Sequence, residues 1–231
     1  MPIFQLTDAP VFPHPSLAED NGLLAVGGDL SVERLLAAYS QGIFPWYSEG
    51  EPPLWWFTHP RLVIFPEEFK VSKRLARSLR NSAFRVSFDG DFSGVIRSCA
   101  AVRKEKGEGT WISTEMEEAY IKLHQAGYAH SVECWLDDEM AGGLYGLQLG
   151  RVFFGESMFT KISNGSKAAL VALVKRLQEE GTALIDCQMT TEHLLTFGAR
   201  EISGSEFRRL LKLHIHSPEM TRESDEQKRQ Q

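Results

Sequence analysis

Two polar residues stand close together in an apolar run near the end of the chain. Asp186 and Gln188 lie two positions apart in LIDCQM, so on a β-strand their side chains leave the same face and Cys187 points to the other. An acid and an amide in such a run must find hydrogen-bond partners, because unpaired burial is costly. This favours a functional cleft. A strand end with solvated polar residues is the alternative.

A third candidate, Glu156, follows Gly155 in the aromatic run FFGESMF. Glycine permits close backbone approach, and Phe153, Met158 and Phe159 offer apolar surface beside the carboxylate. An apolar pocket with one carboxylate suits a substrate that carries an amine and a hydrophobic side chain. A turn acid next to core residues is an equally common alternative.

Positive charge is concentrated around residues 73–80. Lys73, Arg77 and Arg80 fall at i, i+4 and i+7, so they share one helix face, and Arg74 adds a fourth charge. Taken alone, such a run is more often the solvated side of a helix. It is nevertheless a candidate local nucleic-acid patch, although the net charge of -6 argues against binding nucleic acid by bulk electrostatics.

Composition indicates a soluble globular protein in a reducing compartment. The hydrophobic share is 42% and the charged share 24%, both near the average for globular domains. No basic and apolar leader opens the chain, and no apolar run reaches about 18 residues, so neither secretion nor membrane spanning is expected. Cys99, Cys134 and Cys187 form no C-x-x-C pair, which predicts a cytoplasmic protein without structural zinc.

The elements that must position these residues change in character near residue 60. The first stretch is rich in proline, glycine and aromatics, and it predicts one helix over residues 32–41, with Ser31 as N-cap and Gly42 just past its end. Large aromatic side chains follow: Trp46, Tyr47, Trp55, Trp56 and Phe57. Aromatic side chains in a loop suggest a ligand-binding site, but packing of this region onto the main body is the more common reason for such a cluster.

From about residue 62 the pattern is mixed α/β. A strand over 62–65, a helix from Ser72, a strand near 84–88 and a helix over 92–102 lead to a helix that begins with a Thr114/Glu117 capping box. Three strand-like runs then predict an antiparallel meander: HSVECWLD, EMAGGLYGLQLG and RVFFGESMF. A helix over 166–180, the strand TALIDCQMT, a short helix near Glu192 and a helix capped by Ser203 complete the chain.

A meander followed by strand, helix and strand is compatible with the acyltransferase fold of many N-acetyltransferases. Enzymes of that fold that use CoA carry a glycine-rich turn whose backbone N–H groups hold the pyrophosphate at a helix N-terminus. The corresponding loop here, FTKISNGSKAAL, has one glycine. CoA is therefore not expected to be the donor.

Several motifs, in order and spacing, resemble the bacterial leucyl/phenylalanyl-tRNA–protein transferase family. They are NGLLAVGGDLS, GIFPW, LWWF, EGTWIS, GGLYG, FFGESMF and LIDCQ, and they cover residues 21 to about 202. The resemblance implies an α/β protein with a small N-terminal domain, residues 1–60, and a catalytic domain of the acetyltransferase (GNAT) type, residues 61–216. The tail, residues 217–231, has scarcely any apolar residue, so we expect it to be disordered.

The activity implied by the resemblance is transfer of Leu or Phe, less so Met, from aminoacyl-tRNA to proteins that begin with Arg or Lys. The product carries an N-terminal degradation signal. No cofactor is needed, neither ATP nor CoA, because the aminoacyl ester is already activated. The expected partners are aminoacyl-tRNA and the acceptor protein, with no metal and no membrane, and the enzyme is expected to be a cytoplasmic monomer.

The resemblance also assigns roles to residues of this sequence. Family proposals make Gln188 a proton relay coupled to Asp186. Because a neutral amide is a very weak base, we favour Asp186 as the charged acceptor and Gln188 as the group that positions the amine or the ester carbonyl. Glu156 fixes either the donor α-amine or a basic residue of the acceptor. The donor pocket is formed by Leu144, Phe153, Gly155, Met158, Leu170 and Ile185. Trp46 and Trp111 stack on or border the terminal adenosine. Lys73, Arg74, Arg77 and Arg80 follow the acceptor stem through its phosphates.

Phe154 and Leu144 are apolar substitutions relative to the family pattern, and we expect both within the pocket, where they bear on the preference between Leu and Phe.

Three other functions are alternatives to this one. The first is a CoA-dependent N-acetyltransferase, disfavoured by the missing pyrophosphate loop. The second is a catalytically idle adaptor that binds aminoacyl-tRNA or protein N-termini. The third is a metalloenzyme, disfavoured because the histidines show no H-x-x-x-H spacing and His214 and His216 do not face each other on a helix.

Overall fold

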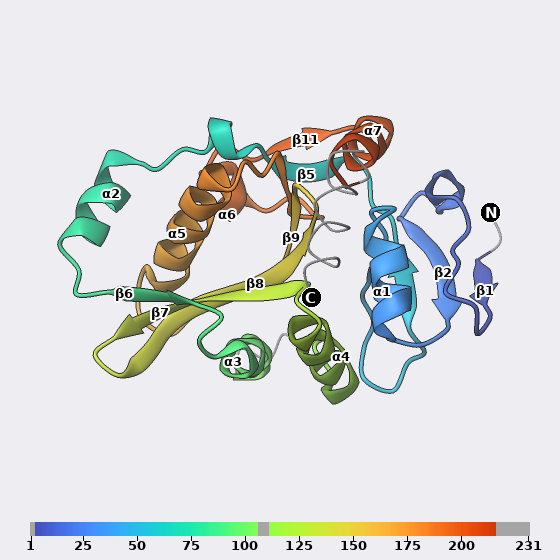
Figure 1. Ribbon diagram of the computed structural model, residues 1–231, viewed down its shortest axis with the longest axis horizontal. Coiled ribbons are helices and arrows are strands. Elements are labelled where there is room, and N and C mark those ends of the chain that lie inside the picture. The colour runs from blue at the N-terminus through green and yellow to red at the C-terminus, as the bar shows by residue number, and fades with distance from the viewer. Residues whose placement is uncertain (1–2, 106–110, 216–231) are drawn as a thin grey trace, which may run out of the picture.

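The first part of the chain forms a small sheet that its irregular sequence did not predict. In a computed structural model, which describes residues 3–105 and 111–215, this sheet has the order β1-β2-β4-β3 (Figure 1). β1 runs parallel to β2, and the other pairs are antiparallel. The strands are β1 (Phe4–Leu6), β2 (Leu23–Gly27), β3 (Phe44–Pro45) and β4 (Leu54–Trp56), with a single 3-10 turn, η1, at Pro15–Leu17.

Helix α1 (Val32–Tyr39) begins as predicted, because the Ser31 side chain accepts a hydrogen bond from the Arg34 N–H. The helix ends at Tyr39 rather than at residue 41, and the chain reverses at Gly42, whose φ is 78°. A Cβ at this position would lie 2.6 Å from the Phe207 ring. Glycine is therefore required here by both the backbone conformation and the close approach of another helix.

The rest of the chain builds a seven-stranded sheet in the order β11-β5-β10-β9-β8-β7-β6. Its strands are β5 (Arg61–Ile64), β6 (Arg85–Phe88), β7 (Ala129–Leu136), β8 (Glu139–Leu149), β9 (Val152–Thr160), β10 (Leu184–Asp186) and β11 (Arg200–Ile202). The predicted meander is confirmed, since β7, β8 and β9 pair antiparallel in sequence order. The predicted crossover is also confirmed, since β10 returns parallel to β9. The sequence did not predict β11, or the antiparallel pairing of β5 with β10.

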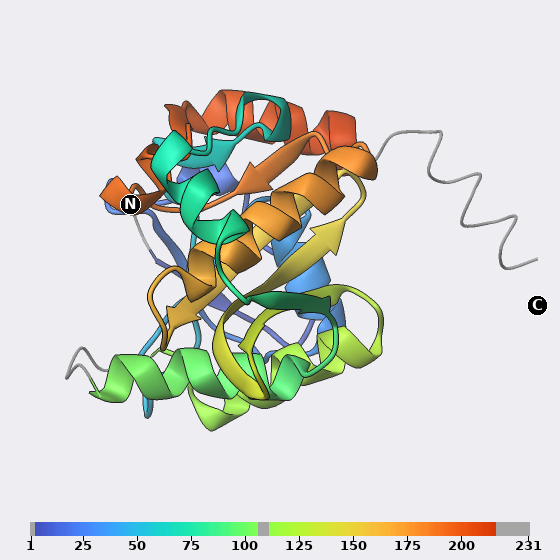
Figure 2. The same ribbon diagram turned by 90° about the vertical axis from the view of Figure 1, so that its left-hand side faces the viewer.

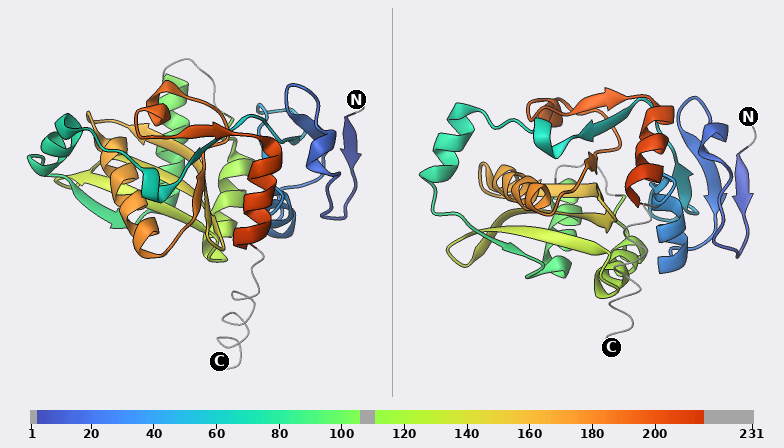
Figure 3. Two further views of the ribbon diagram at one scale, coloured as in Figure 1. Left: turned by 90° about the horizontal axis from the view of Figure 1, so that it is seen from above. Right: turned by 45° about the horizontal axis from the view of Figure 1, so that its top comes forward.

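Helices pack on both faces of this sheet. The helices of this part of the chain are α2 (Lys73–Arg80), α3 (Phe92–Glu105), α4 (Thr114–Gln125), α5 (Gly165–Glu179), α6 (Glu192–Leu195) and α7 (Gly204–Ile215), with a second 3-10 turn, η2, at Pro66–Glu68. α2 lies at one end of the molecule (Figure 1). α5 packs on β7, β8 and β9 from one face, and α3 contacts the same strands from the other (Figure 2). α7 lies between the larger sheet and the small one (Figure 3). The structure thus confirms the predicted class, an α/β fold with a small N-terminal part.

One predicted helix start was wrong by a residue. The N-cap of α4 is Ser113, whose hydroxyl accepts from the Met116 N–H, and Thr114 is the first helical residue. Glu117 is consequently not at the capping-box position, and its carboxylate instead accepts a hydrogen bond from Arg97 at 2.6 Å. Ser113 competes for the same role one position earlier, and the pattern alone did not separate the two.

The two sheets share one apolar core. A single cluster of buried side chains runs from the small sheet and α1 through α7 to α3, α4 and the adjoining face of the larger sheet. A second cluster lies under α5 on the opposite face. No helix within the described residues is long and apolar enough to cross a membrane. The boundary at residue 60 stays a prediction, and the tail predicted to be disordered lies outside the described residues.

Candidate active site

A cavity of about 380 Å³ lies where the small sheet meets the larger domain. All eight residues predicted to bind substrate line it: Trp46, Trp111, Leu144, Phe153, Gly155, Met158, Leu170 and Ile185. Glu156 and Gln188 line it too. The sequence missed several further lining residues, among them Phe44, Ile64, Ser157, Leu173, Cys187, Met189 and His193. Most of these belong to runs that look like ordinary core or loop, so no local signal marked them.

The cavity forms where two neighbouring strands separate. β10 pairs with β9 only at Val152, Phe153 and Phe154, and then ends at Asp186. β9 continues to Thr160, paired with β8 alone. The lining residues of β9 come mainly from this continued part. The cavity therefore reaches both faces of the larger sheet: the apolar face covered by α5, and the opposite face, near which α1 and α4 lie.

Two tyrosines hold Glu156 on the α1 and α4 side. The Tyr39 hydroxyl donates to its Oε1 at 2.8 Å and the Tyr120 hydroxyl donates to its Oε2 at 2.9 Å, and the two hydroxyls also contact each other. Burial raises the pKa of Glu156 to about 7, an effect that the two tyrosine hydrogen bonds oppose. Burial also raises the pKa of both tyrosines well above the usual value. Glu156 can thus exchange a proton near neutral pH while its tyrosines stay protonated.

Asp186 lies beside the cavity rather than on its wall, in a fully buried pair with Arg61. Arg61 Nε donates to Oδ1 at 2.8 Å and Nη2 donates to Oδ2 at 2.7 Å, and neither side chain is exposed. The same guanidinium donates to the Gly42 carbonyl at 2.9 Å and lies 4.5 Å from the centre of the Phe207 ring. Such bidentate, charge-assisted bonds fix both position and orientation.

The predicted alternation of Asp186 and Gln188 on one strand was wrong, because β10 ends at Asp186. Gln188 has a φ of 54° and so lies in a turn of left-handed conformation. Its backbone N–H donates to Asp186 Oδ1 at 3.0 Å, which brings the two residues together by another route. Cys187, expected on the opposite face, also lines the cavity. Gln188 Nε2 has no hydrogen-bond partner among the residues that the structure describes.

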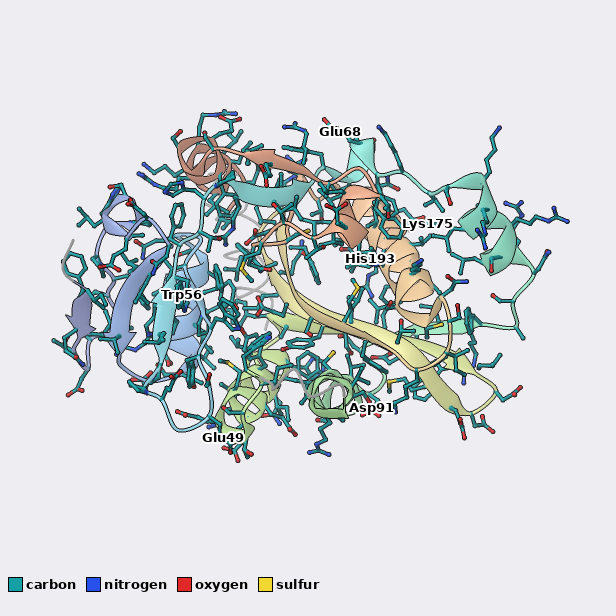
Figure 4. The ribbon with its side chains drawn as sticks, turned by 180° about the vertical axis from the view of Figure 1, so that it is seen from behind. Glu49, Trp56, Glu68, Asp91, Lys175 and His193 are labelled. Atoms are coloured by element: carbon teal, nitrogen blue, oxygen red, sulfur yellow. The ribbon has the colours of Figure 1, made fainter. Side chains whose placement is uncertain are left out.

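Two tryptophans line the cavity. Trp46 is 38% exposed, and its ring lies 5.8 Å from that of Trp56, whose Nε1 donates to the Trp46 carbonyl at 2.6 Å. Trp111, which is partly buried, also lines the cavity. Figure 4 shows Trp56 on the small sheet and His193 in the larger domain beside α5. Since Trp46 and His193 both line the cavity, both parts of the chain contribute to it.

Phe154 does not line the cavity, contrary to expectation. It is fully buried on the other face of β9, with its ring 5.2 Å from Tyr39. The alternation along β9 explains this, since Phe153 takes the cavity side. Leu144, the other substitution expected in the pocket, does line it.

The four basic residues lie on one short exposed helix. Lys73, Arg74, Arg77 and Arg80 all belong to α2, and none is buried. The first three line a shallow surface depression together with Ser78, Asn81 and Ser82, whereas Arg80 does not. Asn164 Nδ2, just before α5, donates to Ser78 Oγ at 3.2 Å and ties α2 to the larger domain. None of the four lines the cavity, so they form a separate basic surface.

The described residues contain no candidate metal cluster, and the loop before α5 has one glycine. No group of three or more His, Cys, Asp or Glu side chains is placed to hold a metal ion within residues 3–105 and 111–215. Before α5 the chain makes one left-handed turn at Asn164. Gly165 then packs so tightly that a Cβ would lie 2.4 Å from the Ala141 carbonyl oxygen. The glycine at this helix start therefore serves packing against β8.

Comparison with known families accounts for most of the chain. A family described as leucyl/phenylalanyl-tRNA protein transferase matches residues 63–212, and its N-terminal domain matches residues 28–59. The chain is 56% identical to the leucyl/phenylalanyl-tRNA–protein transferase of Desulfotalea psychrophila, over 93% of this chain and 95% of that one. It is 58% identical to the enzyme of the same name from Syntrophobacter fumaroxidans, over 93% and 92% of the two chains.

Among solved structures the chain is similar to an aminoglycoside acetyltransferase from a soil metagenomic sample, with a TM-score of 0.39 and 17% identity over 50% of this chain and 84% of that one. It is also similar to L-PGS from Bacillus licheniformis, with a TM-score of 0.42 and 12% identity over 73% and 53% of the two chains.

Proposed function

Because the chain belongs to the leucyl/phenylalanyl-tRNA protein transferase family, we propose that its cavity binds the aminoacyl end of Leu-tRNA or Phe-tRNA and transfers the amino acid to a protein whose first residue is Arg or Lys. The chain is a leucyl/phenylalanyl-tRNA–protein transferase by family, which sets aside the CoA-dependent acetyltransferase and the idle adaptor. The donor is thus an aminoacyl-tRNA and the acceptor a protein. Met is a weaker donor in this proposal, and the product carries a degradation signal.

The observation that carries the proposal is the division of the cavity into an apolar and a polar end. Leu144, Met158 and Leu170 belong to the apolar cluster under α5, whereas Glu156 reaches the opposite side. A Leu or Phe side chain would fill the apolar end, which leaves the α-amine and the ester beside Glu156 and Gln188. Trp46 and Trp111, which also line the cavity, would then meet the terminal adenosine.

The reaction itself needs a positioned neutral amine. The N-terminal nitrogen of the acceptor attacks the ester carbonyl carbon, a C–N bond forms, and the C–O bond to the ribose breaks. The amine loses one proton and the ribose oxygen gains one, so the step balances without a cofactor. An α-amine has a pKa of about 7.7 to 8.0 and is largely protonated at neutral pH, so groups that orient its neutral form accelerate the step. Gln188 Nε2, unpaired among the described residues, is placed to donate to the ester carbonyl oxygen.

For Asp186 we propose a narrower role than that of charged acceptor. Both of its oxygens accept hydrogen bonds from Arg61, and Oδ1 also accepts from the Gln188 N–H. A carboxylate engaged in this way orients Gln188 instead of taking a proton from the substrate. Asp186 is then a positioning residue, and Glu156 is the titratable group in contact with substrate.

The exposed residues Lys73, Arg74, Arg77 and Arg80 of α2 would hold the tRNA through its phosphates. None of the four lines the cavity, which fits a contact on the acceptor stem rather than on the aminoacyl end. The proposal also places the enzyme in the cytoplasm, as a monomer.

Mass spectrometry of an Arg-initiated peptide tests the proposal. Incubation with the purified protein and Phe-tRNA should add one Phe to the Arg peptide and none to a Glu-initiated peptide. Leu170→Phe should lower Phe transfer more than Leu transfer, because the added volume narrows the apolar end, while the volume-conserving Leu170→Met should change the ratio little. Absence of any transfer from either donor would refute the proposal.

A further inference from the structure

A β-bulge in β9 places two consecutive polar side chains on the same face of the sheet. The register of β8 and β9 shifts between Tyr145 and Gly146, and Tyr145 lies opposite Ser157, so Glu156 is the extra residue. Directly opposed residues of paired strands point to the same side, hence Ser157 shares the face of Tyr145. The Tyr145 ring lies 5.5 Å from that of Tyr120, which donates to Glu156. Glu156 and Ser157 therefore face the same end of the cavity.

Ser157 is a buried residue whose hydroxyl the protein leaves unpaired. Its side chain lines the cavity, the residue is 9% exposed, and Oγ has no hydrogen-bond partner within the described residues. Other buried serines of this domain are paired: Ser166 accepts from Thr160 at 2.6 Å, and Ser131 donates to Glu133 at 2.5 Å. A buried hydroxyl without a partner lowers stability. The environment of Ser157 is therefore that of a ligand-binding hydroxyl, whose hydrogen bond a bound ligand would complete.

We propose that Ser157 and Glu156 together bind the α-amino group of the donor amino acid, an inference that rests on the proposed function. An α-amine offers two or three N–H groups and needs more than one acceptor to satisfy them. Each oxygen of Glu156 already accepts a hydrogen from a tyrosine. The Ser157 hydroxyl, next in the chain and on the same face, supplies the second acceptor. Gln188, whose Nε2 also has no hydrogen-bond partner within the described residues, is left for the ester carbonyl.

Two donors that differ only in the α-amine separate this role from other uses of Ser157. Phe-tRNA carries the amine, and 3-phenylpropionyl-tRNA has hydrogen in its place. Ser157→Ala should lower kcat/KM for Phe-tRNA about tenfold, the effect of one hydrogen bond. It should leave transfer from 3-phenylpropionyl-tRNA within about twofold of the unmodified enzyme. An equal loss with both donors would overturn the proposal, as would no loss with either.

Thermal unfolding of the same variants tests whether Ser157 is instead a structural residue. Removing an unpaired buried hydroxyl should leave the midpoint of Ser157→Ala unchanged or raise it. Ser166→Ala is the matched control, because it loses a made hydrogen bond and lies outside the cavity lining: its midpoint should fall while kcat/KM stays unchanged. Ser157→Cys, nearly isosteric and a poor hydrogen-bonding group, should repeat the Ser157→Ala kinetics. A fall in the Ser157→Ala midpoint equal to that of Ser166→Ala would contradict the proposal.

These outcomes also separate this inference from the proposed function. If the unmodified protein transfers no Phe from Phe-tRNA to an Arg peptide, the proposed function fails. If it does and Ser157→Ala behaves like the unmodified protein with both donors, only the role of Ser157 fails.

Discussion

Arg61 and Asp186 form two hydrogen bonds, of 2.8 and 2.7 Å, with both side chains fully buried. The pair lies where three parts of the chain meet, because Arg61 also bonds the Gly42 carbonyl after α1 and contacts the Phe207 ring of α7. Asp186 in turn holds the Gln188 N–H. A structural contact between the small sheet, α7 and β10 is therefore also the support of a candidate catalytic side chain.

This relationship predicts strong coupling in stability. Asp186→Ala should lose about 3–5 kcal/mol of unfolding free energy, because it leaves the Arg61 charge buried and unpaired. Arg61→Met should lose a similar amount, while the double variant should lose clearly less than the sum of the two. Urea unfolding of the four proteins measures this. Additive losses would show that the pair makes no joint contribution.

The same coupling affects how kinetic data on Asp186 are interpreted. A loss of activity in Asp186→Ala could come from partial unfolding, so Asp186→Asn is the better variant for kinetics. If Asp186 positions Gln188, Asp186→Asn should lower kcat without moving the pH dependence of the reaction. A shifted acid limb in that variant would restore Asp186 as the proton acceptor.

Part of the cavity lining was predicted from the sequence, but the residues that support it were not. Glu156, Gln188 and the apolar residues around them lie in short motifs, such as FFGESMF and LIDCQ, that identify them together. Arg61, Tyr39 and Tyr120 come from three separate elements and share no motif with the groups they hold. Their roles depend on tertiary contacts, which no local pattern encodes.

The secondary structure was likewise predicted only in part. Strands of the meander and the helix α5 have strong periodicity and were predicted close to their bounds. The strands of the small sheet have two to five residues each, too few for a periodic signal. The end of β10 was also missed, since the apolar run continues past Asp186 while the backbone turns at Gln188.

The raised pKa of Glu156 predicts a specific dependence of stability on pH. Its pKa rises from 4.5 to about 7 on folding, chiefly through burial. Between these values the folded state binds more protons than the unfolded one, so this residue's contribution is fully present below pH 4.5 and is lost as pH rises to about 7. Relative to Glu156→Gln, the unmodified protein should therefore lose on the order of 1 kcal/mol per pH unit across the window.

Unfolding in urea at several pH values, for the unmodified protein and Glu156→Gln, gives this difference directly. Other titrating groups cancel in the comparison, because both proteins contain them. A difference that does not change between pH 4.5 and 7 would mean that Glu156 keeps an ordinary pKa in the folded state.

The tyrosines around Glu156 predict a shift in the pH–rate profile. Both of their hydrogen bonds lower the pKa of Glu156, so Tyr39→Phe or Tyr120→Phe should raise it further. If the ionised carboxylate holds the donor amine, the acid limb of kcat/KM should move to higher pH, with about five- to tenfold loss at pH 7 and recovery at pH 8.5. Tyr47→Phe, whose hydroxyl lies 3.5 Å from Glu115 and outside the cavity lining, is the control. Loss of activity at every pH would indicate disturbed packing instead.

The basic helix predicts the salt dependence of tRNA binding. Arg77 is exposed on α2, and Arg77→Glu should weaken tRNA binding and reduce the slope of log K against log salt by about 1, as expected for one lost phosphate contact. Lys212→Glu is the control. Lys212 is an exposed residue of α7, which lies far from α2 in Figure 1, and its substitution changes the net charge of the protein by the same amount as Arg77→Glu. Filter binding at several salt concentrations distinguishes the two. An equal effect of both variants would show that net charge matters rather than the position on α2, and an unchanged slope for Arg77→Glu would place the phosphate contacts elsewhere. The effect should also be the same for Leu-tRNA and Phe-tRNA, because a phosphate contact does not read the amino acid.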